Sequence, residues 1–268
     1  MCTLPHVFDN INLEAKAAYV FDIQKNQVVY ENNQNTQLPL ASLTKLMTAL
    51  TAIKLIPTNS KITIKKEFID YNGDEKGITA NESWTLKDLL DFSLITSSND
   101  GMRSVASAIG SQILNSTDYS MGRKEFVTKM NENAKSLGLT QTYYINESGL
   151  DEGKVNGGYG SAENIAQLME YMLKNYPQIL EATKYPVTKI NSLSKTHTAV
   201  NTDTAIEKIP NLIASKTGYT DIAGGNLAVI FDASIGRPIV IVVLGSSENG
   251  RFEDVKTLVQ ASLAYSKE

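Results

Sequence analysis

The chain has 268 residues, of which 42% are hydrophobic and 20% are charged, as is typical of a globular protein with a substantial core. The 25 basic and 29 acidic residues give a net charge of −4, and no Lys/Arg cluster suggests nucleic acid as a partner. Cys2 is the one cysteine, which excludes an intrachain disulfide, and two histidines without cysteine partners argue against a zinc site. We therefore expect no metal and no cofactor, and chemistry that uses hydroxyl, amine and amide groups.

The two features that would place a chain in or across a membrane are missing from the sequence. No apolar run reaches the roughly 18 residues that a membrane-spanning helix needs. Residues 1–4 lack the basic and apolar regions of a secretory signal, so we expect a mature or trimmed chain, or a protein that is not exported.

Strand patterns lie toward the two ends of the chain, and helix patterns lie in the middle. Two short β-type runs about a Lys25-Asn26 turn predict a hairpin over residues 17–31. Apolar, β-branched runs predict late strands over 225–231 and 238–244. Other patterns predict helices over 85–95, 102–109, 123–137, 161–174 and 253–265, and loops over 146–150 and 157–160. We therefore predict an α/β (α+β) fold in which both ends of the chain share one antiparallel sheet around a helical insert.

A predicted helix that begins near Ser42 contains the first candidates for catalysis. Apolar residues recur at three-to-four spacing from Leu43 to Ile56, and Pro39 precedes the helix. Ser42 and Lys45 are three positions apart, so on a helix they lie on the same face. A serine hydroxyl needs a base to take its proton, and a lysine can be that base when its surroundings keep it neutral. A helix cap and a solvated lysine would give the same pattern, so the motif gains weight only from its context.

Two further motifs supply that context. Ser97 and Asn99 form a Ser-x-Asn sequence in a predicted turn between two helices, and Lys216 begins the single Lys-Thr-Gly sequence. A second Ser-x-x-Lys begins at Ser192 and a second Ser-x-Asn at Ser247, so neither of these motifs is specific alone. The combination of all three, in this order, is that of class A β-lactamases and penicillin-binding proteins.

With these motifs the chain resembles the low-molecular-mass penicillin-binding proteins, which are serine-type D-alanyl-D-alanine carboxypeptidases of the SxxK acyltransferases. The resemblance runs from about Ala17 to Val259 and includes the Asn-x-x-Gly-Leu sequence at 146–150 and the Gly-Gly-Asn-Leu sequence at 224–227. Glu147 departs from the family pattern, in which proline is common at this position.

The resemblance implies one β-lactamase/transpeptidase-like catalytic domain over residues 1–268. Its antiparallel five-stranded sheet, flanked by helices, would form a lobe from about 1–65 and 205–268, beside a helical lobe from about 66–204. The implied reaction removes the terminal D-alanine from peptidoglycan stem pentapeptides through an acyl-enzyme, and β-lactams would acylate the same serine. The implied location is extracytoplasmic, in the periplasm or at the outer face of the cytoplasmic membrane, with membrane association only through segments absent from this chain.

The resemblance also assigns catalytic roles residue by residue. Ser42 would attack the carbonyl of the penultimate D-alanine, and Lys45 would be the base for acylation. Lys216, across the cleft, would be a second cation that helps to keep Lys45 neutral and to hold the anionic substrate. Ser97 would relay a proton to the leaving amine, and Asn99 would bind a substrate carbonyl and Lys45.

Substrate binding is assigned in the same way. The backbone N–H groups of Ser42 and Tyr219 match the family's oxyanion hole. Thr217 offers its hydroxyl to the terminal carboxylate, and Gly218 belongs to the same substrate-binding strand. Arg251 is a candidate carboxylate partner, with an ordinary surface arginine as the alternative.

Two other functions stay open at this point. A class A-like serine β-lactamase shares the three motifs but needs a glutamate to activate the deacylating water. Glu147 and Glu163 are the candidates, and neither lies in the loop pattern that those enzymes use. A catalytically idle penicillin-binding module would keep the pocket, although it would need neither Lys45 nor Ser97.

Overall fold

The computed structural model describes residues 6–69 and 77–267, so Cys2 and the rest of residues 1–4 lie outside the described part. Within the described residues the α-helices are α1 (Thr44–Leu55), α2 (Leu86–Thr96), α3 (Asn99–Leu114), α4 (Tyr119–Ser136), α5 (Ala162–Asn175) and α6 (Gly250–Tyr265). The strands are β1 (Ala17–Asp22), β2 (Gln27–Asn32), β3 (Leu38–Pro39), β4 (Lys61–Thr63), β5 (Ser83–Thr85), β6 (Tyr143–Tyr144), β7 (Gly158–Gly160), β8 (Val187–Asn191), β9 (Thr196–Val200), β10 (Leu212–Thr220), β11 (Gly224–Asp232) and β12 (Pro238–Ser246).

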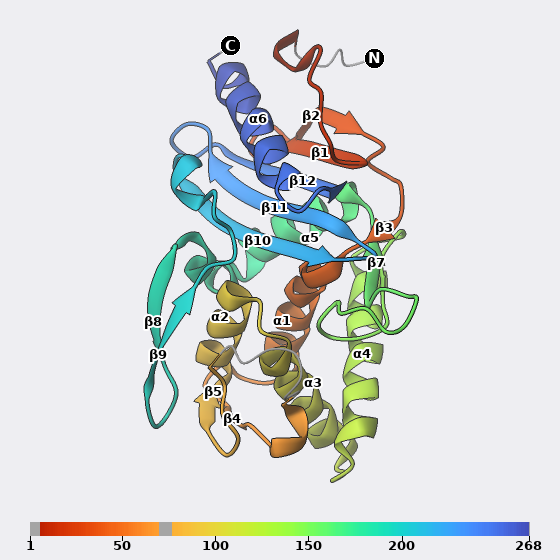
Figure 1. Cartoon of the computed structure of the whole chain (residues 1–268), viewed down its shortest axis with the longest axis vertical. Helices are drawn as coiled ribbons and strands as arrows, with labels where there is room; N and C mark the ends of the chain where they lie inside the picture. Colours follow the sequence, from red (N-terminus) through yellow and green to blue (C-terminus); the bar gives the residue numbers. More distant parts are fainter. Residues whose placement is uncertain (1–5, 70–76, 268) are drawn as a thin grey trace.

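One antiparallel sheet combines the two ends of the chain, in the strand order β10-β11-β12-β1-β2 (Figure 1). In its register, Val20 of β1 lies opposite Ile241 of β12. The predicted hairpin is formed by β1 and β2, with Asn26 in the left-handed region at its turn. The predicted five-stranded antiparallel sheet is therefore confirmed, and β10, which contains the Lys-Thr-Gly motif, is its edge strand.

Both faces of this sheet are covered, which explains the continuous apolar sequence of β12. Successive residues of a strand point to opposite faces. Val240 and Val242 belong to the core that includes α1 and α5, whereas Ile239 and Ile241 belong to the core beneath α6. The sheet therefore lies between α6 on one side and the remaining helices on the other.

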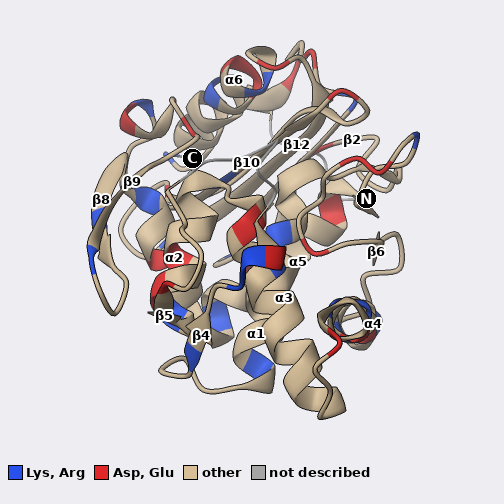
Figure 2. Cartoon of the chain, turned by 60° about the horizontal axis from the view of Figure 1, so that its bottom comes forward, with Lys and Arg blue, Asp and Glu red and all other residues tan. Residues whose placement is uncertain are grey.

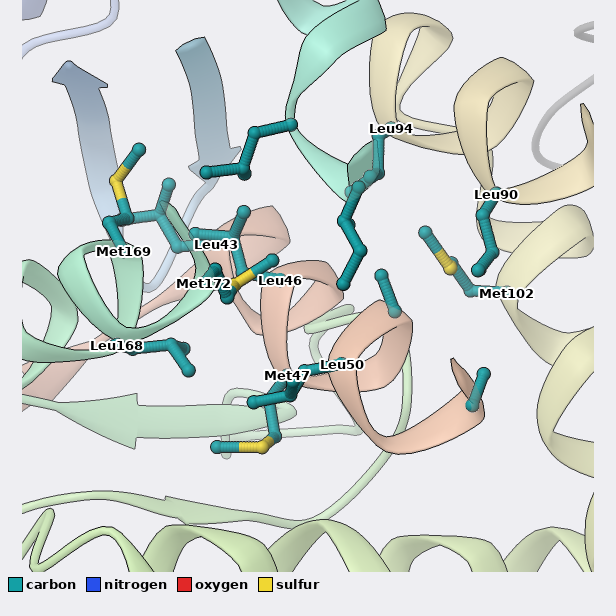
Figure 3. Packing of buried hydrophobic residues seen from close by; sticks show 14 of the residues in the cluster. Leu43, Leu46, Met47, Leu50, Leu90, Leu94, Met102, Leu168, Met169 and Met172 are labelled. Carbon is teal, nitrogen blue, oxygen red and sulfur yellow. The ribbon is translucent and has the colours of Figure 1, made fainter. Parts of the chain in front are cut away.

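Helix α1 is the centre of the larger core. Its residues from Thr44 to Ala52 are buried on every side, because α2, α3, α4 and α5 all contact it. Figure 3 shows Leu46 and Met47 of α1 among the side chains of neighbouring helices, with Met172 of α5 close to Leu46. The helix that begins beside Ser42 is therefore held rigidly by the packing around it.

Helix α4 lies at the outside of the molecule and buries one narrow stripe. Its buried residues recur every four positions, at Gly122, Phe126, Met130 and Ala134. Figure 2 looks nearly along this helix and shows charged residues of both signs around it. The helix begins before residue 123, the predicted start, because the Asp118 carboxylate accepts hydrogen bonds from the first backbone N–H groups.

Several elements differ from the predicted ones. Helix α3 begins at Asn99 because the Ser98 hydroxyl caps it, so Asn99 lies on the helix and not in a turn. Residues 158–160, predicted as loop, form β7, which pairs with β3 and β6. The β8–β9 hairpin was not predicted, and its turn contains the second Ser-x-x-Lys sequence.

In residues 6–69 and 77–267, no helix combines the length and the apolar character needed to cross a membrane. Helix α5, from the middle of the chain, packs against β1 and β12 of the sheet. The division into a sheet lobe and a helical lobe at the predicted boundaries stays a prediction.

Asp91 on α2 should make the stability of the fold depend on pH. One carboxylate oxygen accepts a hydrogen bond from Lys87, and the other is buried without a partner among the described residues. Burial raises the pKa of Asp91 to about 6, although Lys87 opposes this shift. A raised carboxyl pKa stabilises the folded state below the unfolded value of 3.8, and this contribution is lost as the pH rises through about 6.

We therefore expect Asp91→Asn to raise the melting temperature at pH 7.5 and to change it little at pH 4. The gain at neutral pH should correspond to about 1–3 kcal/mol, since the variant has no charge to bury. Thermal unfolding at both pH values measures the difference, with Glu132→Gln on the surface of α4 as the control. An equal change at both pH values would contradict the assignment.

Candidate active site

Ser42 lies in a short 3₁₀ turn, Ala41–Leu43, that leads directly into α1. Ala41 has a φ of 47°, in the left-handed region that an alanine rarely adopts. Such strain persists only where the surrounding structure enforces it, and it is frequent at active sites. The turn therefore presents Ser42, which is partly exposed, at the start of a helix whose first nine residues, 44–52, are buried.

Lys45 is completely buried one turn further along, and its Nζ has three oxygen neighbours at 2.7 Å. These are Ser42 Oγ, Asn99 Oδ1 and the backbone oxygen of Ser148. Of the three, Asn99 Oδ1 and the Ser148 carbonyl can only accept hydrogen bonds. A neutral amine has two N–H donors and one lone pair, so donating to both of these oxygens leaves the lone pair for the Ser42 hydroxyl. This is the arrangement expected if Lys45 is the base for Ser42, a role that stays a prediction.

Ser97 and Lys216 contact each other where the end of α2 approaches β10. Ser97 ends α2 with a φ of 58°, again in the left-handed region. The buried Lys216 ammonium donates to Ser97 Oγ at 3.0 Å and to the Thr217 carbonyl at 2.8 Å. A hydroxyl in contact with a lysine can pass on a proton, which is the property expected of Ser97.

The glycine of the Lys-Thr-Gly motif allows β10 to lie against the nucleophile. A Cβ on Gly218 would lie 2.9 Å from the Leu40 carbonyl oxygen and 3.1 Å from the Ser42 backbone nitrogen. Any side chain there would therefore push the edge strand away from Ser42. Since Tyr219 follows directly, the backbone of Ser42 and the edge of β10 are close together, as an oxyanion hole requires.

Thr217 and Arg251 have partners within the protein. Thr217 Oγ1 lies 2.5 Å from Thr202 Oγ1. Arg251 is 7% exposed and is not a surface arginine, because its Nη1 donates to the Gly218 carbonyl at 2.7 Å. Its guanidinium also lies over the rings of Tyr219 and Phe252. Arg251 thus supports the motif strand, and a role toward a substrate carboxylate stays a prediction.

The structure brings in residues that the sequence motifs did not indicate. The Ser148 carbonyl contacts Lys45 from the Asn-x-x-Gly-Leu loop, but a backbone acceptor has no side-chain signature. Asp203 accepts a hydrogen bond from Ser215, the residue before Lys216, and burial raises the pKa of Asp203. Thr202, which contacts Thr217, directly precedes Asp203 in the sequence.

The two glutamates considered for a lactamase are engaged elsewhere. Arg123 Nε donates to Glu147 Oε2 at 2.6 Å, and the Glu147 side chain is completely buried. Glu163, in the first turn of α5, accepts a hydrogen bond from Gln167 at 3.3 Å. Arg123 thus pairs with one Glu147 oxygen, the other oxygen is buried without a hydrogen-bond partner among the described residues, and Glu163 is paired within α5.

The second Ser-x-x-Lys sequence forms no comparable pair. Ser192 Oγ makes hydrogen bonds with the backbone of Lys195 in the β8–β9 turn. The Lys195 ammonium donates instead to Thr79 Oγ1 at 3.1 Å and lies 3.6 Å from a Glu82 oxygen. Ser192 therefore lacks the contact with a lysine amine that Ser42 has.

Comparison with known proteins gives an independent view of this site. The peptidase S11 family model, described as D-alanyl-D-alanine carboxypeptidase, matches residues 5–248. The chain is 32% identical over 252 residues to D-alanyl-D-alanine carboxypeptidase DacF of Bacillus subtilis, covering 92% of this chain and 61% of that relative. It is 27% identical over 233 residues to the D-alanyl-D-alanine endopeptidase of Escherichia coli, covering 85% of this chain and 70% of that relative.

Among solved structures, penicillin-binding protein D2 from Listeria monocytogenes in its cefotaxime-bound form is similar over nearly the whole chain. The TM-score is 0.78 at 26% sequence identity, and the match covers 94% of this chain and 98% of that one. The two proteins therefore share the fold in which the three motifs meet.

Proposed function

The chain belongs to the peptidase S11 family of serine D-Ala-D-Ala peptidases, and from this premise we propose that it is a serine-type D-Ala-D-Ala carboxypeptidase. Its substrate would be the peptidoglycan stem pentapeptide, from which it removes the terminal D-alanine. The observation that carries the proposal is the 2.7 Å contact between Lys45 Nζ and Ser42 Oγ, beside contacts of Nζ with Asn99 Oδ1 and the Ser148 carbonyl, which can only accept. Members of the family are extracytoplasmic cell-wall enzymes, so we propose the same location for this protein.

Acylation begins at Ser42. Its hydroxyl proton passes to the Lys45 amine while Oγ forms a bond to the carbonyl carbon of the penultimate D-alanine. The developing oxyanion accepts hydrogen bonds from the backbone N–H groups of Ser42 and Tyr219, a device worth roughly 10²–10³ in rate per donor in other serine enzymes. The close approach of β10 at Gly218 supports this assignment.

Breakage of the peptide bond needs a proton on the leaving amine. Ser97 Oγ, which accepts a hydrogen bond from the Lys216 ammonium, can donate its own proton there and take a replacement from Lys216. Free D-alanine then departs and leaves an ester on Ser42. Water attacks this ester and gives its proton to the Lys216 amine. As the shortened peptide leaves, the proton held by Lys45 returns to Ser42 Oγ, which restores both lysines to their starting states. A β-lactam would form the same ester, in keeping with the cefotaxime-bound state of the similar Listeria protein.

Selectivity for a free terminal carboxylate tests the carboxypeptidase proposal. Thr217 and Lys216 offer a hydroxyl and a cation that are not needed for attack on a carbonyl but suit an anion one residue beyond it. Release of D-alanine from a stem pentapeptide should therefore exceed cleavage of the C-terminal amide by about 100-fold or more in kcat/KM. Thr217→Val should reduce this preference by about tenfold, since it removes a hydrogen bond to a charged group.

Thr257→Val on α6, far along the chain from the three motifs, is the control and should keep the parental preference. Comparable kcat/KM for acid and amide peptides would remove the carboxypeptidase assignment. Endopeptidase activity is the second candidate, because a relative of 27% identity has that name. Cleavage of a cross-linked peptide dimer faster than of the pentapeptide would favour it, and steady turnover of penicillin would favour a lactamase.

A further inference from the structure

Asn156 is a completely buried residue that makes hydrogen bonds to three separate parts of the candidate active site. Its Oδ1 accepts from the N–H groups of Ala41 at 3.1 Å and Gly158 at 3.2 Å, and its Nδ2 donates to Gly149 O at 3.0 Å, Asp151 Oδ1 at 2.7 Å and Thr220 Oγ1 at 3.2 Å. The side chain thus uses both its acceptor and its donor groups. Only an amide offers an acceptor and two donors in one small planar group.

The first contact controls the residue before the nucleophile. Ala41 has a left-handed backbone, and a free alanine would leave this conformation readily. The hydrogen bond from its N–H to Asn156 Oδ1 helps to hold it. Relaxation of Ala41 would rotate the peptide that contains the Ser42 N–H, which is one of the two proposed oxyanion donors.

The second contact controls the loop that reaches Lys45. Asn156 Nδ2 donates to the carbonyl of Gly149, which directly follows Ser148. The Ser148 carbonyl accepts a hydrogen bond from Lys45 Nζ. If Lys45 is neutral, this bond uses one of its two N–H groups. Gly149 itself lies so close to Ala41 that a Cβ would be 1.8 Å from the Ala41 carbonyl oxygen. The loop and the nucleophile turn are therefore packed directly on each other.

The third contact controls the end of the edge strand. Thr220 is the last residue of β10 and follows Tyr219, the other proposed oxyanion donor. Its hydroxyl lies near Asn156 Nδ2 and also donates to Asp151 Oδ1 at 3.0 Å. One amide therefore connects the Ser42 turn, the Lys45 acceptor loop and the Tyr219 strand.

We propose that Asn156 is a positioning residue. It holds the Ser42 and Tyr219 N–H groups and the Ser148 carbonyl in the relative positions that acylation needs. This inference rests on the proposed serine peptidase function. It differs from a purely structural role in one respect: loss of the amide should slow the chemical step more than it weakens binding or folding. The displaced groups act in the transition state, and a misplacement of about 1 Å can cost about 100-fold in rate.

The test measures acylation by a labelled penicillin and separates the non-covalent dissociation constant from the first-order acylation constant k2. Asn156→Ala should lower k2 by about ten- to 100-fold and change the dissociation constant little. The matched control is Asn164→Ala, because Asn164 is also buried and its Oδ1 accepts from Gln141 and Thr142, neither of which is a site group named above. It should lower the melting temperature comparably and leave k2 of the folded protein near the parental value.

A second substitution tests the mechanism of the effect. Glycine adopts a positive φ readily, so Ala41→Gly combined with Asn156→Ala should recover part of k2. Thr220→Val removes one of the three contacts and should lower k2 by a few fold, a result that is available even if Asn156→Ala fails to fold.

Each remaining outcome has a distinct reading. If penicillin acylates the parent and k2 is parental in both Asn156→Ala and Thr220→Val, the inference about Asn156 fails. The proposed function is unaffected by that result. A loss of k2 in Asn164→Ala as large as that in Asn156→Ala would also overturn it, because general destabilisation would then explain the effect. A parent that penicillin does not acylate at Ser42 would overturn the proposed function, and the inference with it.

Discussion

Ser42→Ala is expected to abolish the mass increase that penicillin produces in the intact protein, while the melting temperature stays close to that of the parent. Ser42 Oγ is the hydroxyl beside the Lys45 amine, and removing it removes the bond-forming atom. The side chain is partly exposed, so alanine leaves no large buried cavity. Mass spectrometry of the intact chain and of its peptides measures the effect.

The second Ser-x-x-Lys sequence provides the matched control. Ser192 also lies three residues before a lysine, but the Lys195 ammonium contacts Thr79 and Glu82 and not the Ser192 hydroxyl. Ser192→Ala therefore removes a serine with the same spacing and no lysine contact. This variant should be acylated like the parent. A label that persists in Ser42→Ala, or that maps to Ser192, would show that the nucleophile has been misassigned.

Lys45→Arg is expected to lower the acylation rate on the order of 10³-fold, the middle of the usual range for loss of a general base. A guanidinium cannot give up its proton at any ordinary pH, so it cannot accept the proton of Ser42. The larger guanidinium would also not fit, because Lys45 is completely buried and three oxygens already lie 2.7 Å from its Nζ. Lys45→Met, of similar length, should lose the rate equally while fitting the core better.

Lys54 is the control for this substitution, because it lies on the same helix but is exposed and donates to Asn133. Lys54→Arg should keep the parental acylation rate and melting temperature. Stopped-flow measurement of labelled penicillin, with circular dichroism to establish folding, gives both quantities. A folded Lys45→Arg chain that reacts at near-parental rate would reject Lys45 as the base.

What the sequence by itself determined was local. Ser42 and Lys45 are neighbours because helical geometry brings positions i and i+3 together. Thr85 caps α2 through the backbone N–H of Asp88, as a threonine at that position predicts. Strands β1, β11 and β12 of the central sheet were predictable because their apolar runs are buried on both faces. The β8–β9 hairpin was not, since most of its residues are exposed and one of its few buried positions is the polar His197.

Only the tertiary structure decided which distant groups meet at Ser42. Asn99 and Ser148 contact the amine of Lys45 from 54 and 103 residues away, and Ser97 meets Lys216 across 119 residues. The burial of Arg251 and the contacts of Asn156 depend equally on packing between segments. Periodicity and spacing report the preferences of neighbouring residues, whereas these contacts exist because burial of the core brings separate segments together. A backbone carbonyl such as that of Ser148 exists in every residue, so only its position in the folded chain distinguishes it.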